Sequence, residues 1–321
     1  MSAPTGSDVP AAPPVFFVLM ATKDRCDRLP AAIDSVLAQS YPHWRLFVQD
    51  DGSTDETQAV LGRVRSHPGI DVGRFERNRG ANAARNAALE RILARGEAGF
   101  LVILDDDDVF EPDALAGFAA AIERQPDQRW FIARCRDHAG RSLTRLRGRG
   151  LLCYLRDHKC GSRLAGEVVH AIDVGLIRDT RFPNRFANAE EWGFFGEIAT
   201  RSRIQPLDHV ATRMTLLPDG LTHSHLNRHR ALEVYELKYQ LFAPMLLPRQ
   251  RARLLGKIGR HAFRAGDFDR IEGLIREAVA ESILEPRIAL LAIDLLRHRV
   301  SVRLQWLRDR FSVRRRTRGQ T

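Results

Sequence analysis

The sequence predicts an α/β fold in which a mostly parallel sheet is flanked by helices and followed by an α-helical C-terminal region. Two observations carry this prediction. The first part of the chain alternates short apolar runs with amphipathic stretches of helical spacing, and the part beyond residue 227 contains helical patterns alone. The apolar runs are continuous, as in strands buried on both faces, and parallel strands require helical crossovers.

The elements follow one another in a regular order. Residues 1–14 are small and proline-rich, so they contain too few apolar side chains to order themselves, and we expect a flexible N-terminal arm. Apolar runs predict strands at residues 15–21, 44–49, 71–76 and 100–104. Helical spacing predicts helices at residues 28–39, from about residue 53, and at 81–95.

Four further helices are predicted in the C-terminal part. They cover residues 230–242, 249–263, 268–281 and 287–299. We therefore expect an α/β domain over residues 15–226 and a helical region with a basic tail over residues 227–321.

The charge of the chain is concentrated at its C-terminus. The chain has 321 residues and a net charge of +10, and residues 297–321 contain nine arginines and one aspartate, a net +8. Subtraction leaves only +2 for the rest of the chain. A basic balance usually indicates nucleic acid or an anionic membrane as partner, but here that inference applies to the tail alone.

Cysteine spacing and hydropathy exclude several classes of protein. The four cysteines (Cys26, Cys135, Cys153 and Cys160) form no CxxC pair, which argues against a zinc site or a disulfide framework and favours a reducing compartment. The apolar run Val15–Ala21 is far shorter than the ~20 residues of a membrane span. We expect no signal peptide, no transmembrane helix and a cytoplasmic location.

Acidic residues follow two of the predicted strands. Four aspartates, Asp105–Asp108, come after the run FLVIL, and Asp50 and Asp51 come after LFVQ. Adjacent unit charges about 4 Å apart repel by ~4 kcal/mol at an effective dielectric near 20. If these are neighbouring strand tips at the ligand-binding edge of the sheet, Mg²⁺ or Mn²⁺ held with phosphate oxygens would offset the repulsion. The alternative is a solvated acidic loop.

The turns themselves also carry helix-start signals. Ser53 and Glu56 have capping-box spacing, and Pro112 is suited to the first turn of the next helix. The sequence NRGANAARNAALE places a glycine and two asparagines before a helix that carries Arg85, and such a helix start can receive an anion. The alternative is simply a well-capped helix.

Together these stretches resemble the inverting family-2 glycosyltransferases. The resemblance rests on ATKDRCDRLPAAIDSVLAQSYPHWRLFVQDDGSTDET, NRGANAARNAALE and FLVILDDDDVFEPDAL, and it extends more weakly to about residue 227. It implies the glycosyltransferase-A type of nucleotide-binding sheet, a nucleotide-diphosphate sugar donor (a UDP-sugar is favoured) and Mg²⁺ or Mn²⁺. Lys23 and Asp24 stand where the family commonly has an aromatic residue and an amide.

The resemblance also implies roles for individual residues. Thr22 and Arg25 would lie near the nucleoside, Asp51 beside the base, and Arg85 near the base or the phosphates.

The acidic run would supply the family's DxD-type motif. Asp105 and Asp107 take its outer positions, with Asp107 as the direct metal ligand and Asp106 facing the ribose or diphosphate.

A further carboxylate is implied downstream. NAEEWGFFGEIATR resembles the family's acidic pair and aromatic helix, with Glu190 and Glu191 in place of glutamate and aspartate, so Glu191 would be the general base. An exposed helix start is the alternative. His223 or His225 is the best candidate for a third metal ligand, although such histidines are usually surface residues, and neither belongs to the predicted site.

The tail and the acceptor complete the predicted partners. Val300, Leu304, Leu307 and Phe311 share a helical stripe among arginines, so residues 300–318 are expected to lie on an anionic membrane surface, at the inner face of the membrane. A last helix packed on its own domain is the alternative. The acceptor would be a glycan or a lipid-linked molecule in the synthesis of cell-surface polysaccharide or glycoconjugate.

Three rival functions remain at this point. A nucleotidyltransferase would want a glycine-rich phosphate loop, and ATKDRCDRLP contains no glycine. Nucleic-acid binding is not expected, because the basic tail has no stacking aromatics beyond Trp306 and Phe311. A catalytically silent relative that binds only the donor stays open because of the Glu190–Glu191 substitution.

Overall fold

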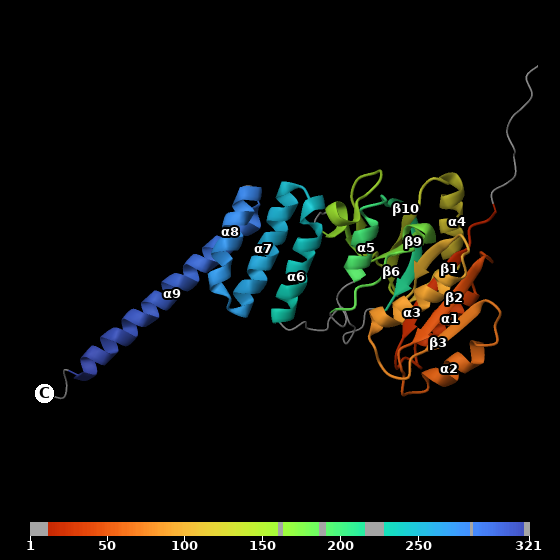
Figure 1. Cartoon of the computed structure of the whole chain (residues 1–321), viewed down its shortest axis with the longest axis horizontal. Coiled ribbons are helices and arrows are strands. Elements are labelled where there is room, and N and C mark those ends of the chain that lie inside the picture. The colour runs from red at the N-terminus through yellow and green to blue at the C-terminus, as the bar shows by residue number, and fades with distance from the viewer. Residues whose placement is uncertain (1–11, 160–162, 186–190, 216–227, 283–284, 318–321) are drawn as a thin grey trace, which may run out of the picture. The chain divides into compact units, whose positions relative to one another are not determined.

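The computed structural model describes residues 12–159, 163–185, 191–215, 228–282 and 285–317, without the side chains of residues 159, 228–231, 303 and 306–317. The chain divides into two compact units that meet in sequence near residue 224 (Figure 1). Each unit is described by itself.

The first unit is built on an eight-stranded sheet with the strand order β3-β2-β1-β4-β9-β6-β10-β5. The strands are β1 (Phe16–Thr22), β2 (Trp44–Asp50), β3 (Ile70–Arg74), β4 (Phe100–Ile103), β5 (Val109–Phe110), β6 (Trp130–Asp137), β9 (Val168–Asp173) and β10 (Gln205–Met214). Two short strands, β7 (Thr144–Leu146) and β8 (Leu164–Gly166), form a separate antiparallel pair. Parallel pairing joins β3-β2-β1-β4 and β6-β10, so the predicted mostly parallel α/β fold is confirmed.

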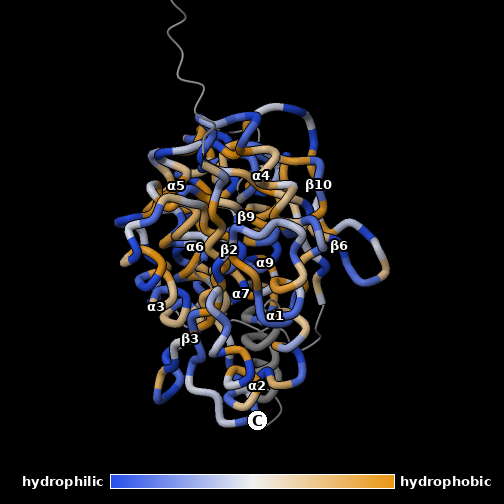
Figure 2. Tube along the Cα trace, turned by 90° about the vertical axis from the view of Figure 1, so that its right-hand side faces the viewer, coloured by the Kyte–Doolittle hydropathy of each residue, from blue (hydrophilic) through white to orange (hydrophobic). Residues whose placement is uncertain are grey.

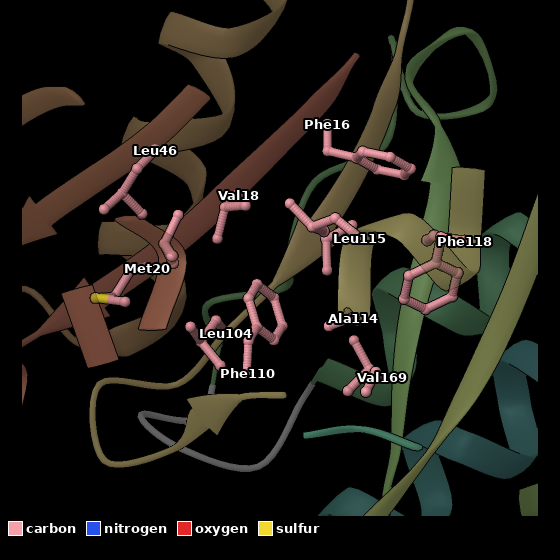
Figure 3. Packing of buried hydrophobic residues seen from close by; sticks show 14 of the residues in the cluster. Phe16, Val18, Met20, Leu46, Leu104, Phe110, Ala114, Leu115, Phe118 and Val169 are labelled. Atoms are coloured by element: carbon pink, nitrogen blue, oxygen red, sulfur yellow. The ribbon is translucent and has the colours of Figure 1, made fainter. Parts of the chain in front are cut away.

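The described residues of this unit contain the α-helices α1 (Leu29–Leu37), α2 (Thr57–Val64), α3 (Ala81–Ala94), α4 (Ala114–Arg124) and α5 (Glu191–Ile198). Strand β1 is buried almost throughout, and its alternate side chains face opposite sides of the sheet. Phe16, Val18 and Met20 pack in one core with α1 and α4, as Figure 3 shows for Leu115 and Phe118. Helix α3 contacts β1 and β2 and lies outside that core, so it covers the other face.

Two local predictions of helix starts are wrong. Helix α2 begins at Thr57, and Ser53 does not cap it: the Ser53 hydroxyl accepts from the Asp24 N–H (2.9 Å) and donates to Asp50 Oδ1 (2.5 Å). Pro112 lies before Ala114, the first residue of α4, and outside the helix. In both places the strand-end turn is longer than the sequence pattern suggests.

In the second unit, the described residues form the α-helices α6 (Arg228–Phe242), α7 (Pro248–Ala265), α8 (Phe268–Glu281) and α9 (Pro286–Thr317). Leu255, Ile258 and Leu291 are among its core residues, and Gly259 of α7 leaves room for the Leu291 side chain of α9. In Figure 2, orange, the hydrophobic end of the scale, appears beside the label of strand β9 of the first unit, where Val169, Ala171 and Ile172 are buried.

The last predicted helix and the predicted amphipathic stripe form one continuous helix, α9. Val300 and Leu304 on that stripe are about half exposed (50% and 51%), and the side chains of Leu307 and Phe311 lie outside the described residues. Within the described part of the chain, no helix is both long and apolar enough to cross a membrane.

Candidate active site

The carboxyl ends of several strands meet at one edge of the sheet. Strand β1 lies between β2 and β4, and all three run parallel. The chain continues from β1 to β2 on one side and reaches β4 on the other, which is the kind of switch point where α/β sheets bind ligands. Strand β9 is antiparallel to both β4 and β6, so the carboxyl end of β6 lies at this edge as well.

The two acidic turns do not follow neighbouring strands, so that prediction is wrong. Because β1 separates β2 from β4, their ends are about 10 Å apart at two strand spacings. Asp51 accepts hydrogen bonds from the backbone N–H groups of Arg79 (2.7 Å) and Gly80 (2.9 Å), just before α3. Asp50 accepts from the Ser53 N–H (3.0 Å). Hydrogen bonds within the protein therefore satisfy the first pair of carboxylates.

Thr22 and Arg25 lie at the end of β1, as expected. Thr22 is 3% exposed, and its backbone carbonyl accepts from the Asp51 N–H (2.9 Å), which ties the ends of β1 and β2 together. The Arg25 N–H donates to the Thr57 hydroxyl (3.0 Å), and its Nε lies 3.7 Å from Asp106 Oδ1. The structure therefore brings Arg25 to the acidic turn after β4.

The aspartates of that turn differ in environment. Asp105 has a half-exposed side chain, whereas Asp106 and Asp108 are buried. Burial raises the pKa of Asp106 to about 7, although the nearby Thr22 hydroxyl lowers it in part. Burial and the charge of Asp105 raise the pKa of Asp107, and the same two causes raise that of Asp108 to about 8. The surroundings therefore resist full ionisation of the turn unless a cation is present.

The donors of this turn fit a hard divalent cation. No group of three or more His, Cys, Asp or Glu side chains among the described residues is arranged to hold a metal ion. Mg²⁺, however, is usually held by one or two carboxylates together with substrate phosphates rather than by a cage of protein ligands. His223, His225 and Glu190 lie outside the described residues.

Arg85 connects two parts of the predicted site, the acidic turn after β4 and Glu191 at the start of α5. Its guanidinium donates to Glu191 Oε1 (2.7 Å) through Nη1 and to Asp105 Oδ1 (3.1 Å) through Nη2, and Nη1 also reaches Asn82 Oδ1 (3.1 Å). The residue is only 9% exposed. Burying a guanidinium is costly unless it is paired, and here two carboxylates pair with it. Glu191, 106 residues along the chain, is thereby placed beside the acidic turn.

Glu191 is the first residue of α5, and 37% of its side chain is exposed. Oε1 of Glu191 accepts from Arg85, and Oε2 makes no hydrogen bond with the described residues. A carboxylate held in this way at the carboxyl-end edge of the sheet can accept a proton from a bound hydroxyl group.

Sequence reasoning assigned no individual role to several polar residues of this edge. Buried Asp108 accepts from the Thr215 N–H at the end of β10 (3.0 Å). Asn86, one turn after Asn82 on α3, makes two hydrogen bonds with the backbone of Phe182. The spacing of Asn82 and Asn86 puts them on one helix face, which was the signal available in the sequence.

Comparison with known proteins agrees with this geometry. Residues 17–165 match the family described as "Glycosyl transferase family 2". TuaG of Bacillus subtilis (strain 168), named for teichuronic acid biosynthesis, is 37% identical over 103 residues, which cover 32% of this chain and 39% of TuaG. The Escherichia coli protein WfgD, a UDP-Glc:alpha-D-GlcNAc-diphosphoundecaprenol beta-1,3-glucosyltransferase, is 34% identical over 93 residues, 29% of this chain and 35% of WfgD. The matched segments span less than half of these relatives.

Solved structures share the fold at low sequence identity. TarS 1–349 of S. aureus in complex with UDP-GlcNAc has a TM-score of 0.61 and 19% identity, covering 88% of this chain and 80% of that one. The mannosyltransferase PcManGT from Pyrobaculum calidifontis, in complex with GDP-Man and Mn²⁺, has a TM-score of 0.51 and 19% identity, with coverages of 89% and 80%. The likeness shows the fold, which is of the predicted glycosyltransferase-A type.

Proposed function

We propose that this chain, whose residues 17–165 match the family-2 glycosyltransferases, transfers a hexose from a nucleotide-diphosphate sugar to an acceptor hydroxyl, with inversion at the anomeric carbon. One observation carries the proposal furthest: buried Arg85 bonds both Asp105 and Glu191. This contact joins Glu191, the proposed proton acceptor, and the acidic turn after β4 to one cationic side chain.

In the proposed reaction, Glu191 accepts the proton of the acceptor hydroxyl while that oxygen attacks the anomeric carbon. The bond from this carbon to the diphosphate breaks on the opposite face, so no covalent intermediate is required. Arg85, which is paired with Glu191 and with Asp105 of the acidic turn, would orient Glu191 and would stabilise negative charge on a departing diphosphate bound at that turn.

The remaining residues would bind the donor. Thr22 and Arg25 at the end of β1 would lie along the nucleoside, with Asp51 beside the base and Asp106 toward the ribose or diphosphate. Asp107 would hold Mg²⁺ or Mn²⁺, whose chemistry is to neutralise the diphosphate charge. Since Asp51 already fixes the backbone before α3, it would shape the base pocket partly by placing that loop.

The partners proposed for the chain follow from its relatives. A UDP-sugar is favoured because TarS was solved with UDP-GlcNAc, and WfgD is named for transfer from UDP-Glc to a diphosphoundecaprenol acceptor. We propose a glycan or lipid-linked acceptor in polysaccharide or glycoconjugate synthesis. Transfer would take place in the cytoplasm, with residues 300–318 on the anionic inner face of the membrane.

A two-stage assay tests the proposed reaction. Thermal shift with a panel of nucleotide-diphosphate sugars and Mn²⁺ identifies the donor, and transfer to acceptor or slow donor hydrolysis is then measured. General-base assistance is typically worth about 10²–10⁴-fold, so Glu191→Gln should lower kcat by that factor and leave the donor Kd nearly unchanged. Exposed Glu123→Gln on α4 is the matched control and should behave like the wild type.

Other outcomes of this assay identify the rivals. Donor binding with no turnover by the wild type would indicate a silent relative. Release of inorganic diphosphate from a nucleoside triphosphate and a sugar phosphate would indicate a nucleotidyltransferase. NMR of the product's anomeric proton decides between inversion and retention.

A further inference from the structure

One face of helix α3 holds the chain segment that precedes Glu191. Asn82 Nδ2 donates to the Pro183 carbonyl (2.7 Å), and Glu90 forms a two-pronged ion pair with Arg181 (2.6 and 3.0 Å). Between them on the helix, Asn86 contacts Phe182. These contacts link residues about a hundred positions apart in sequence, so they form only when the fold is complete.

Asn86 makes the most specific of these contacts. Its Nδ2 donates to the Phe182 carbonyl (2.8 Å), and its Oδ1 accepts from the Phe182 N–H (2.8 Å). The side-chain amide thus pairs with both backbone groups of one residue, as a neighbouring strand would. Aspartate lacks the donor and alanine lacks both groups, so neither residue could replace asparagine in this pairing.

The segment held in this way packs directly against α5. The rings of Phe182 and Phe194 are stacked, with centroids 4.0 Å apart and an interplanar angle of 12°. A Cβ on Gly193 would lie 2.5 Å from Pro183 Cγ, so glycine lets α5 approach this closely. Glu191 is two residues before Gly193, in the first turn of α5.

We propose that Asn86 is a positioning residue for the reaction: through Phe182 and Pro183 it fixes the start of α5 and hence the Glu191 carboxylate. The inference rests on the proposed role of Glu191 as general base. Arg85 on the same helix then holds the carboxylate itself, so α3 fixes both the backbone and the side chain of the base. Both hydrogen bonds that Asn86 makes with the described residues go to the Phe182 backbone and not to the acidic turn. We therefore assign Asn86 no part in donor binding.

A double-mutant cycle tests this inference. Asn86→Ala, Glu191→Gln and the double variant are compared for kcat of transfer and for nucleotide-sugar Kd. A misplacement of about 1 Å can cost about 10²-fold in rate, so we expect Asn86→Ala to lower kcat about 10- to 100-fold with an unchanged donor Kd. In the Glu191→Gln background, Asn86→Ala should have no further effect, because the group that it positions is already lost.

Two further variants guard against a general loss of structure. Gly193→Ala should displace α5 from Pro183 and lower kcat like Asn86→Ala, by a change outside α3. Asn184→Ala, an exposed asparagine two residues beyond Phe182, is the matched control and should keep wild-type kcat. All variants are assayed below their measured unfolding temperatures.

The outcomes separate this inference from the proposed function. An Asn86→Ala loss that is the same size in both backgrounds, or a parallel loss of donor binding, overturns the positioning role while leaving Glu191 as base. Wild-type kcat in Asn86→Ala overturns it as well. Wild-type kcat in Glu191→Gln overturns the proposed base and the inference together.

Discussion

Individual residues at the strand ends determine how closely the loops of the site pack. Gly52, in the turn after β2, has φ = 73°, and a Cβ there would lie 2.6 Å from the backbone carbonyl carbon of Arg77. The loop before α3 therefore rests on the glycine itself. The same loop supplies the Arg79 and Gly80 N–H groups that bind Asp51, so this packing also fixes the start of the helix that carries Arg85.

Gly52→Ala is expected to destabilise the first unit strongly. The left-handed backbone costs an L-residue about 1–2 kcal/mol, and the clash with Arg77 adds about 1–3 kcal/mol. Gly96→Ala is the matched control, because Gly96 also has positive φ (66°) but nothing lies within 4 Å of the Cβ position. Urea unfolding should show a loss of about 1–2 kcal/mol for Gly96→Ala and a clearly larger loss for Gly52→Ala. Equal losses would contradict the packing argument.

Residue types in the site were more predictable than the contacts they make. The motifs indicated Arg85 and Glu191, but their 2.7 Å ion pair joins positions 106 residues apart, and no local pattern encodes such a contact. Asp51 was assigned from its place after a strand, yet its carboxylate is used by the backbone of another loop. Hydrogen-bond partners of this kind depend on how the loops pack, which periodicity does not report.

At the scale of elements, apolar runs and helical spacing located β1, β2, β4 and α3 closely, because strong burial gives a strong pattern. The order of the strands was less accessible: the placement of β1 between β2 and β4 follows from the chain's crossovers and not from any local signal. Strands β5, β6, β9 and β10 were not predicted individually. Two of these strands, β6 and β10, carry the arginines that pair with the buried carboxylate of Glu111.

Those partners form an ion triad where β5, β6 and β10 meet. Glu111 follows β5 and is 7% exposed, and its Oε1 lies 2.8 Å from Arg136 of β6 and 3.3 Å from Arg213 of β10. Burial would raise the pKa of Glu111, but the two arginines outweigh it and lower the pKa below its ordinary value of 4.5. The triad therefore ties the antiparallel edge strand to the rest of the sheet.

Glu111→Gln is expected to lower the free energy of unfolding by about 1–3 kcal/mol at neutral pH, less than for a fully buried pair because the arginines are partly exposed. Since the folded pKa is depressed, the stabilisation is present above about pH 4.5 and is lost as the pH falls through the lower folded value. The difference between the wild type and the variant should therefore shrink toward pH 3. Urea unfolding at several pH values, followed by tryptophan fluorescence, measures it. A difference that grows on acidification, or one matched by exposed Glu123→Gln, would refute the role of the triad.

At the scale of the whole molecule, the described site residues all belong to the first unit, and the two units have separate hydrophobic cores. The proposed catalytic residues and the basic tail are thus carried by different parts of the chain. The sequence itself places the basic charge in the tail, because the net charge of residues 297–321 is +8. The molecule that the tail contacts cannot be predicted from the sequence of this chain alone, because the contact also depends on the chemistry of the partner.

A chain ending at residue 226 should separate the two activities. We expect it to unfold cooperatively and to bind the donor sugar nucleotide as the full chain does, because Thr22, Arg85, Asp107 and Glu191 remain.

The full chain should sediment with phosphatidylglycerol vesicles but not with phosphatidylcholine vesicles, since each basic residue near an anionic surface contributes about 1 kcal/mol. At about 1 M salt the Debye length falls to about 3 Å, and this binding should largely disappear. A full-length variant with the arginines from 308 to 318 replaced by glutamine controls for the loss of the helices. If that variant still sediments, or if the shortened chain does, the membrane contact does not lie in the tail.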